Sequence, residues 1–298
     1  MKLNFRQYDP KLDAKKVFNL WQEKLGEIWP LDFAGFKQII ASGNHFVATD
    51  DEKIVGFIAT QILGEKSSIL TIMGNDNGLL NYVTQYLKSK KVKQIQLGDG
   101  GISYFWPGIP TNLPKLIRFF EDNDWEFTED SFDLVRNLDN YQTPEFVFQR
   151  LSGINVQTAN IKSVDKVLEF EKKYFSEWLS AYKRKAELND LSDIFYAEDK
   201  NKDIVGTIFV FSADSRSAKE HQIWKQLLGD DMGGICCLGV RKDMRQKGVG
   251  LALAAYSTEM LRDRKVNNVY VGYTWLVDWY GKLGYKVWRQ YKMSWKKI

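Results

Sequence analysis

Residues 234–250 read GICCLGVRKDMRQKGVG and run from an apolar segment through a basic, glycine-containing loop. The segment Ile235–Val240 is typical of a buried strand. Four apolar residues after the loop recur at the spacing of one helical face: Val249, Leu253, Tyr256 and Met260. The first N–H groups of a helix lack partners within it, and the helix dipole favours negative charge there. Because Arg245 and Lys247 add positive charge, the stretch predicts a phosphate-binding loop.

Two common phosphate-binding motifs do not fit this loop. A Walker loop needs Lys followed by Ser or Thr after its last glycine, where this chain has Leu251 and Ala252. A dinucleotide-binding loop needs a third glycine three residues after Gly250, and that position is Leu253. The pattern that fits is Arg-x-x-Gly-x-Gly at residues 245–250, which resembles the pyrophosphate loop of the GNAT superfamily of N-acetyltransferases. A structural turn that caps a helix is the alternative.

A second signal lies downstream of the loop. Residues 269–273 are typical of a strand, and residues 278–285, DWYGKLGY, look like the superfamily's Tyr-x-x-x-Gly-Phe/Tyr signature. In that family the tyrosine of this signature, here Tyr280, donates a proton to the leaving thiolate. The loop and the tyrosine together identify residues 150–298 as a member of the superfamily.

The resemblance implies that the second half of the chain binds acetyl-CoA. The residues expected to contact it are Leu238, Val240, Arg245, Gln246, Lys247, Gly248, Val249 and Gly250. The pantetheine arm would pair with the edge of the strand at 235–240. We expect the backbone N–H of Leu238 to stabilise the charge that develops on the thioester oxygen.

Acetyl transfer also needs a base, because the attacking amine must be neutral. No histidine is placed for that role, so a carboxylate is expected to serve. The candidates are Asp230, Asp231, Glu177 and Asp278, with Glu177 also expected to contact the acceptor. For each of them an ordinary solvated carboxylate is the competing interpretation.

The two halves of the sequence resemble each other. Lys53–Ile58 (KIVGFI) matches residues 203–208 (DIVGTI) at an offset of 150, and residues 119–125 match residues 279–285 at an offset of 160. Similar offsets favour a duplicated domain. We therefore predict an α/β fold of two tandem GNAT-like domains, each a twisted mixed sheet flanked by helices, at residues 1–140 and 141–298.

The first copy departs from the family at both functional points. It has Gly74–Gly78, GNDNG, where the second copy has its basic loop, and Phe120 where the second copy has Tyr280. We therefore expect the first copy to be degenerate and to have lost cofactor binding. A second active site with unusual ligands is the alternative.

Aromatic residues suggest where an acceptor could bind. Residues 105–110, FWPGIP, form an aromatic segment with two prolines. Phe105 and Trp106 are either part of a rigid turn or a platform for a sugar or another flat apolar ligand. Trp275 has the same two interpretations.

Composition excludes several function classes. A net charge of +4 over 298 residues gives no case for nucleic acid as a main partner. His45 and His221 offer no metal-ligand cluster, and no Gly-x-Ser-x-Gly elbow marks a hydrolase. Cys236 and Cys237 are neighbours in a strand, which disfavours a disulfide between them. The N-terminus carries no apolar signal and no segment reaches membrane-spanning length, so we expect a cytoplasmic protein.

The acceptor is expected to be a small primary amine. The FWPGIP segment and the YTWLVDWY segment at 273–280 resemble glucosamine and glucosaminide N-acetyltransferases, which favours an amino sugar. Other small amines, aminoacyl transfer and a protein lysine stay open. So does a non-catalytic acyl-CoA-binding regulatory module, in which Tyr280 would be dispensable.

Overall fold

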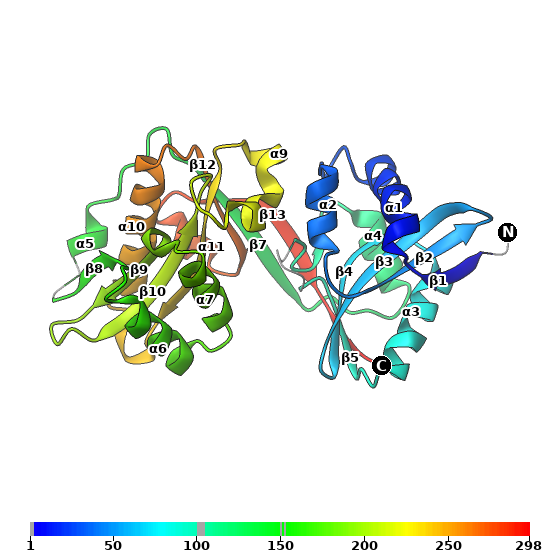
Figure 1. Ribbon diagram of the computed structural model, residues 1–298, viewed down its shortest axis with the longest axis horizontal. Helices are drawn as coiled ribbons and strands as arrows, with labels where there is room; N and C mark the ends of the chain where they lie inside the picture. Colours follow the sequence, from blue (N-terminus) through cyan, green and yellow to red (C-terminus); the bar gives the residue numbers. More distant parts are fainter. Residues whose placement is uncertain (1–2, 100–104, 150, 152) are drawn as a thin grey trace. The chain divides into compact units, whose positions relative to one another are not determined.

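The computed structural model describes residues 3–99, 105–149, 151 and 153–298. The chain forms two units (Figure 1): unit 1 comprises Met1–Phe132 and Arg289–Ile298, and unit 2 comprises Asp133–Trp288. The expected boundary lay between residues 140 and 141. The observed units differ from that division because the last ten residues join unit 1 and residues 133–140 join unit 2.

Unit 1 is a mixed sheet with strand order β1-β2-β3-β4-β5-β14. Its strands are β1 (Asn4–Gln7), β2 (Asn44–Asp50), β3 (Lys53–Leu63), β4 (Lys66–Met73), β5 (Gln94–Leu97) and β14 (Trp295–Lys297). The short strand β6 (Ile109–Pro110) lies outside this sheet and pairs with Tyr291 and Lys292. Its helices are α1 (Pro10–Lys24), α2 (Phe33–Ile39), α3 (Asn77–Ser89) and α4 (Pro114–Glu121). In the described part of this sheet, β4 and β5 are parallel and the other neighbouring strands pair antiparallel.

The helices of unit 1 cover both faces of its sheet. Phe46 on β2 packs against Tyr82 and Tyr86 of α3, whereas Phe57 on β3 packs against Phe36 of α2. Phe46 is paired with Ile58, so Phe46 and Phe57 point to opposite faces. The sheet is therefore buried on both sides.

Unit 2 is a second mixed sheet, with strand order β13-β7-β12-β11-β10-β9-β8. The strands are β7 (Glu129–Asn137), β8 (Asn155–Thr158), β9 (Ile194–Glu198), β10 (Ile204–Phe211), β11 (Gly233–Val240), β12 (Asn268–Thr274) and β13 (Lys286–Met293). Unit 2 contains β7 from Asp133 on and β13 up to Trp288, and the other residues of these two strands belong to unit 1. The helices are α5 (Phe146–Gln149), α6 (Val164–Tyr174), α7 (Leu179–Glu187), α8 (Ala218–His221), α9 (Lys225–Leu228), α10 (Val249–Asp263) and α11 (Val277–Gly281), with short 3-10 turns η1 (Leu191–Asp193), η2 (Gln222–Trp224) and η3 (Lys242–Met244).

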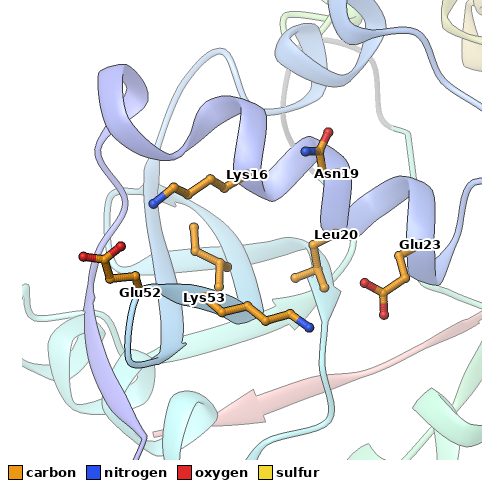
Figure 2. A pocket seen from close by; sticks show the side chains of 7 residues that line it. Lys16, Asn19, Leu20, Glu23, Glu52 and Lys53 are labelled. Carbon is orange, nitrogen blue, oxygen red and sulfur yellow. The ribbon is translucent and has the colours of Figure 1, made fainter.

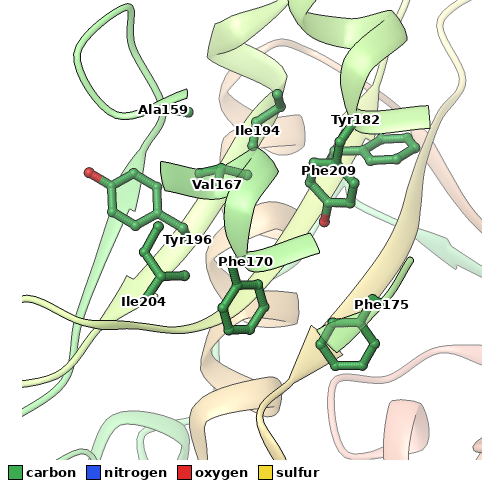
Figure 3. Packing of buried hydrophobic residues seen from close by; sticks show 9 residues of the cluster. All are labelled: Ala159, Val167, Phe170, Phe175, Tyr182, Ile194, Tyr196, Ile204 and Phe209. Atoms are coloured by element: carbon green, nitrogen blue, oxygen red, sulfur yellow. The ribbon is translucent and has the colours of Figure 1, made fainter. Parts of the chain in front are cut away.

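Two helix layers enclose the sheet of unit 2. The α6–α7 pair packs on the face that carries Ile194 and Phe209, and Figure 3 shows Tyr182 of α7 beside Phe209 in this cluster. The opposite face belongs to α10, whose Tyr256 packs edge-on against Phe195 at 5.3 Å between ring centroids. The strand that precedes the predicted loop, β11, thus lies in the middle of a covered sheet.

Candidate functional site

The central strand β11 of unit 2 is interrupted by a β-bulge. Its pairing with β10 runs from Gly239 opposite Thr207 to Cys236 opposite Phe209. Two residues, Cys237 and Leu238, therefore face the single residue Ile208. Cys237 has a φ of 51°, a left-handed conformation that costs free energy in a residue with a side chain.

The bulge coincides with a separation of β11 from β12. These parallel strands pair at Gly233 with Val269 and at Gly234 with Tyr270, and their described residues form no further ladder pair. Cys236 and the two bulge residues are consequently half-buried, although they lie in a central strand. An extended ligand can reach the backbone of β11 here, which is the place where the sequence predicted the pantetheine arm.

Helix α7 and the α6–α7 turn hold the bulge in place. The hydroxyl of Tyr182, a fully buried residue, donates a hydrogen bond of 2.8 Å to the carbonyl of Cys237. Phe175 packs so closely on Gly239 that an added Cβ there would lie 2.6 Å from its ring. Gly239 is therefore required by this close approach.

The predicted phosphate loop leads from β11 into α10 as expected. The N–H of Arg241 donates to the carbonyl of Val205 at 2.9 Å, which anchors the start of the loop. Gly248 is the N-cap of α10 with a φ of 86°, a conformation that favours glycine. No side chain caps this helix and its first turn contains no acidic residue. The N–H groups of the first turn consequently have no partner within the helix, as an anion site requires.

The charges of the loop are arranged by local contacts. The Nε of Arg245 donates to the carbonyl of Val240 at 3.0 Å, which holds the exposed guanidinium beside the end of β11. Asp243, the acidic residue of the loop, forms an ion pair with Arg241 at 2.7 Å. Gln246 and Lys247 are exposed next to Gly248. Positive charge therefore exceeds negative charge next to the uncapped N-terminus.

Tyr280 lies on α11, and contacts of its neighbour link that helix to the loop. The ring of Trp279 covers Gly250, since an added Cβ at this glycine would lie 3.3 Å from it. Tyr280 is 5% exposed and packs edge-on against Trp279 at 4.7 Å and Tyr285 at 5.6 Å between ring centroids.

The environment of Tyr280 keeps its hydroxyl protonated. Burial raises the pKa of Tyr280 most, and the neighbouring thiols of Cys236 and Cys237 add to the effect. These interactions place the phenol near the bulge. Burial also raises the pKa of Cys236 to about 12, so this thiol is a poor nucleophile near neutral pH.

The expected carboxylates occupy different places. Asp278 is exposed in the first turn of α11, and Glu177 is exposed in the turn between α6 and α7. Asp230 is exposed and pairs with Lys225 at 3.0 Å. Asp231 accepts a hydrogen bond from the side chain of Asn267 before β11 begins, roughly 20 Å of extended strand from the bulge. A base acts within hydrogen-bond reach or through one water, so the structure corrects the expectation for Asp231.

The aromatic segment at 105–110 also needs a correction. Trp106 is 2% exposed and lies 6.0 Å from Trp21 and 5.7 Å from Trp29 between ring centroids, all within unit 1. Phe105 is equally buried and stacks on Trp106. Both rings are core residues of unit 1, so they do not form an exposed platform. Trp275, by contrast, is 53% exposed in the turn between β12 and α11.

Sequence reasoning missed Glu171. It lies on α6 and is fully buried, and its Oε1 accepts a hydrogen bond from the hydroxyl of Thr207. Burial, opposed by the hydrogen bond from Thr207 and assisted by the charge of Glu177, raises the pKa of Glu171 to about 7. One signal was present: Glu171 continues the helical spacing of the apolar residues Val164 and Val167, which places a carboxylate on the buried face.

The corresponding helix start in unit 1 differs in its capping. Asp76 is the N-cap of α3, and its carboxylate accepts a hydrogen bond of 2.7 Å from the N–H of Leu79. The ring of Phe5 covers Gly78. Phe120, the counterpart of Tyr280, is fully buried against Phe119 and Trp125.

A pocket of about 270 Å³ lies on unit 1 (Figure 2), between α1 and the β2–β3 hairpin. Its lining residues are Lys16, Asn19, Leu20, Glu23, Glu52, Lys53 and Ile54. None of them is a predicted site residue. Within the described residues, no group of three or more His, Cys, Asp or Glu could hold a metal, and no helix is long and apolar enough to cross a membrane.

Comparison with known proteins agrees with this geometry. Residues 161–285, which lie within unit 2, match the model of the acetyltransferase (GNAT) family. No curated protein matches the sequence.

Solved structures match the whole chain. A region of a fungal multi-domain GH3 β-N-acetylglucosaminidase, described as a GCN5-related glucosamine N-acetyltransferase region, superposes with a TM-score of 0.89 at 25% identity, covering 99% of this chain and 38% of that one. This chain thus spans less than half the length of that protein. A GCN5-related N-acetyltransferase from Sphaerobacter thermophilus superposes with a TM-score of 0.71 at 16% identity. The match covers 99% of this chain and 95% of that chain.

A tandem GNAT protein from the clavulanic acid biosynthesis pathway also matches, with a TM-score of 0.66 and 10% identity over 99% of this chain and 98% of its own. These matches confirm the predicted fold class, a mixed α/β fold of two GNAT-like units in tandem.

Proposed function

We propose that unit 2 transfers an acetyl group from acetyl-CoA to the primary amine of an amino sugar. The observation that carries the proposal is the conjunction of an uncapped, basic helix start at Gly248 with a bulged strand that separates from its neighbour. A pyrophosphate needs the free N–H groups of the helix start, and an extended pantetheine arm needs the open edge of the strand.

The donor set fits coenzyme A. The N–H groups from Gln246 to Gly250 would donate hydrogen bonds to the pyrophosphate, and the carbonyl of Val240 holds Arg245 beside them. Acetyl-CoA supplies an activated acetyl group as a thioester. Unit 1 is proposed to bind no coenzyme A, because Asp76 already occupies the start of α3 with a negative charge.

The residues of unit 2 divide the chemistry among them. Leu238, in the bulge, is placed to donate its backbone N–H to the carbonyl oxygen as negative charge develops there. Tyr280, protonated and near the bulge, is placed to give its proton to the departing thiolate sulfur. The ring of Trp279 packs on Gly250 and keeps α11 against the loop. This contact would fix the position of Tyr280 relative to the phosphate site.

Two observations support an amino sugar as the acceptor. The fungal region with 25% identity is described as a glucosamine N-acetyltransferase region. On this chain, Trp275 exposes a ring that could stack on a sugar, and the exposed Glu177 could attract an ammonium group.

The test is a turnover assay of the full chain with acetyl-CoA and a panel of acceptors: glucosamine, a polyamine, free amino acids and a lysine peptide. Thiol release and the mass of the product would be measured. We expect glucosamine to give the highest kcat/KM and a product heavier by one acetyl group. A preference for another amine would overturn the acceptor assignment. Coenzyme A binding without turnover of any amine would instead indicate an acyl-CoA-binding module.

A further inference from the structure

Glu171 occupies an unusual place for a carboxylate. It is fully buried on the face of α6 that packs on the sheet, next to the apolar residues Val167 and Phe170. The hydroxyl of Thr207 donates to its Oε1, but its buried Oε2 has no hydrogen-bond partner among the described residues. The described residues also include no ion-pair partner for it. A buried oxygen of this kind calls for an explanation, and a catalytic role is one of the few available.

The contacts of Glu171 place it beside the bulge. Thr207, its hydrogen-bond donor, is paired across the ladder with Gly239, one residue after Leu238. Tyr182, which donates to the carbonyl of Cys237, is electrostatically coupled to Glu171. Burial raises the pKa of Cys237 most, and the negative charge of Glu171 adds to the rise. The carboxyl group and the proposed acetyl carbonyl site therefore share one neighbourhood.

We propose that Glu171 is the base of the acetyl transfer and that its Oε2 accepts the proton which the acceptor amine loses. This inference rests on the proposed function. The acceptor ammonium first loses one proton to solvent. As the resulting neutral amine attacks, the N–C bond forms, its nitrogen gives a second proton to Glu171, and the C–S bond breaks as Tyr280 protonates the sulfur. Glu171 then releases its proton to solvent and Tyr280 regains one. The sum converts one ammonium and one thioester into one amide, one thiol and one released proton.

The surroundings suit this role near neutral pH. Burial raises the pKa of Glu171 to about 7, the Glu177 charge adds to the rise, and the Thr207 hydrogen bond opposes it. The groups that face the carboxyl are Thr207 from β10, Tyr182 from α7, Cys237 from β11 and Glu177 from the α6–α7 turn. None of these is cationic. A base is most effective when its pKa lies near the working pH.

The first experiment compares Glu171→Gln with the wild type in full-length protein. The amide oxygen of Gln can still accept from Thr207, but it cannot take the proton. We expect kcat to fall by at least about a hundredfold while the coenzyme A dissociation constant stays unchanged. Glu169→Gln is the matched control, because Glu169 is an exposed carboxylate on the same helix, and this variant should keep most of kcat. Glu171→Ala should regain part of its rate when formate is added.

The second experiment uses the wild type alone, so it does not depend on how the variants fold. The acid limb of kcat/KM would be measured with several acceptors whose amines differ in pKa. If a group of the enzyme is the base, the acid limb of kcat/KM should lie near pH 7 for every acceptor. A limb that follows the pKa of each acceptor would contradict the proposal, and so would a Glu171→Gln variant with wild-type rates. If the wild type acetylates no amine at all, the proposed function fails instead, and this outcome is separate from a failure of Glu171.

Discussion

The hydroxyl of Tyr280 and the thiols next to it illustrate how single residues set the chemistry of unit 2. Its ring is fixed by Trp279 and Tyr285, and burial raises its pKa, so the proton stays on the oxygen across the physiological range. A group in that state can act as an acid but not as a base. The same burial makes the neighbouring thiols inert, which leaves Tyr280 as the proposed proton donor.

Replacement of Tyr280 by Phe tests this role because it keeps the ring and removes the proton. We expect kcat to fall at least about tenfold with unchanged coenzyme A affinity. The high-pH limb of the rate profile should also move or vanish. Single-turnover rates are the measurement, since they exclude a limit set by product release. An unchanged chemical rate would exclude Tyr280 as the acid.

Glu171 should make stability depend on pH in a defined direction. Its folded pKa, about 7, lies above the ordinary value of 4.5, so its contribution is full below about pH 4.5 and is lost as pH rises through 7. Relative to Glu171→Gln, the wild type should therefore lose up to about 3 kcal/mol of unfolding free energy between pH 4.5 and 7. Urea unfolding of both proteins across this range is the measurement. A constant difference would show that Glu171 titrates normally.

Residues whose role is local were predictable from the sequence, and residues whose role depends on packing were not. Gly248 and Tyr280 lie in spaced motifs, so their elements could be predicted and are confirmed. Glu171 was missed because its importance comes from contacts with Thr207 on another element. Of the two interpretations of Trp106, the ligand platform fails because Trp21 and Trp29 enclose the ring, which the sequence of the proline-rich aromatic segment does not show.

At the level of elements, the two equivalent helix starts show how a duplicated unit can lose a site. Helix α3 carries Asp76 as its cap, whereas α10 carries Gly248 and leaves its first turn uncapped. A capping carboxylate stabilises a helix start but occupies the N–H groups that an anion would use. The sequence showed this difference, but it did not show the bulge at Cys237, because a bulge depends on the register with β10.

A buried ion network joins α7, η1 and α10 on the scaffold of the site. Asp193 accepts from Lys185 at 2.6 Å and from Arg264 at 2.5 Å, and Lys185 also contacts Ser217 at 2.8 Å. Lys185 is 1% exposed, so it cannot regain water when its partner is lost.

Asp193→Asn should therefore lower the unfolding free energy by about 3 kcal/mol, the lower end of the usual cost of breaking a buried ion pair, because Lys185 keeps a longer pair with Asp190 at 3.9 Å. Equilibrium urea denaturation measures this loss. Glu65→Gln is the control, because it breaks an exposed pair with Lys93 and should leave the midpoint nearly unchanged. Equal effects of the two variants would contradict the importance given to the buried network.

At the level of the whole molecule, each unit contains residues from both ends of the repeat. Strand β14, from the end of the sequence, pairs with β5 of unit 1, and Tyr291 and Met293 are fully buried residues of that unit. The end of β7 lies next to β12 in unit 2. Sequence offsets identified the repeat, but they could not reveal this exchange, because strand order depends on long-range pairing rather than on local pattern.

Removal of residues 289–298 should consequently destabilise unit 1 rather than trim a loose end. The truncation exposes the edge of β5 and removes the buried side chains of Tyr291, Met293 and Ser294. We expect the truncated chain to have a lower thermal midpoint and to be cleaved faster within residues 1–132. Mass spectrometry of the proteolytic fragments identifies the cleavage sites. A truncated chain that unfolds at the wild-type temperature would show that β14 is dispensable.

The most direct test of the central claim is calorimetric titration of the full chain with coenzyme A. If the uncapped start of α10 is the cofactor site, the wild type binds one molecule per chain and Gly248→Asp binds none, because a carboxylate then occupies the place of the phosphate. Asp76→Ser, which removes the negative cap of α3, should leave the stoichiometry at one. Two equivalent sites in the wild type, or undiminished binding by Gly248→Asp, would contradict the account.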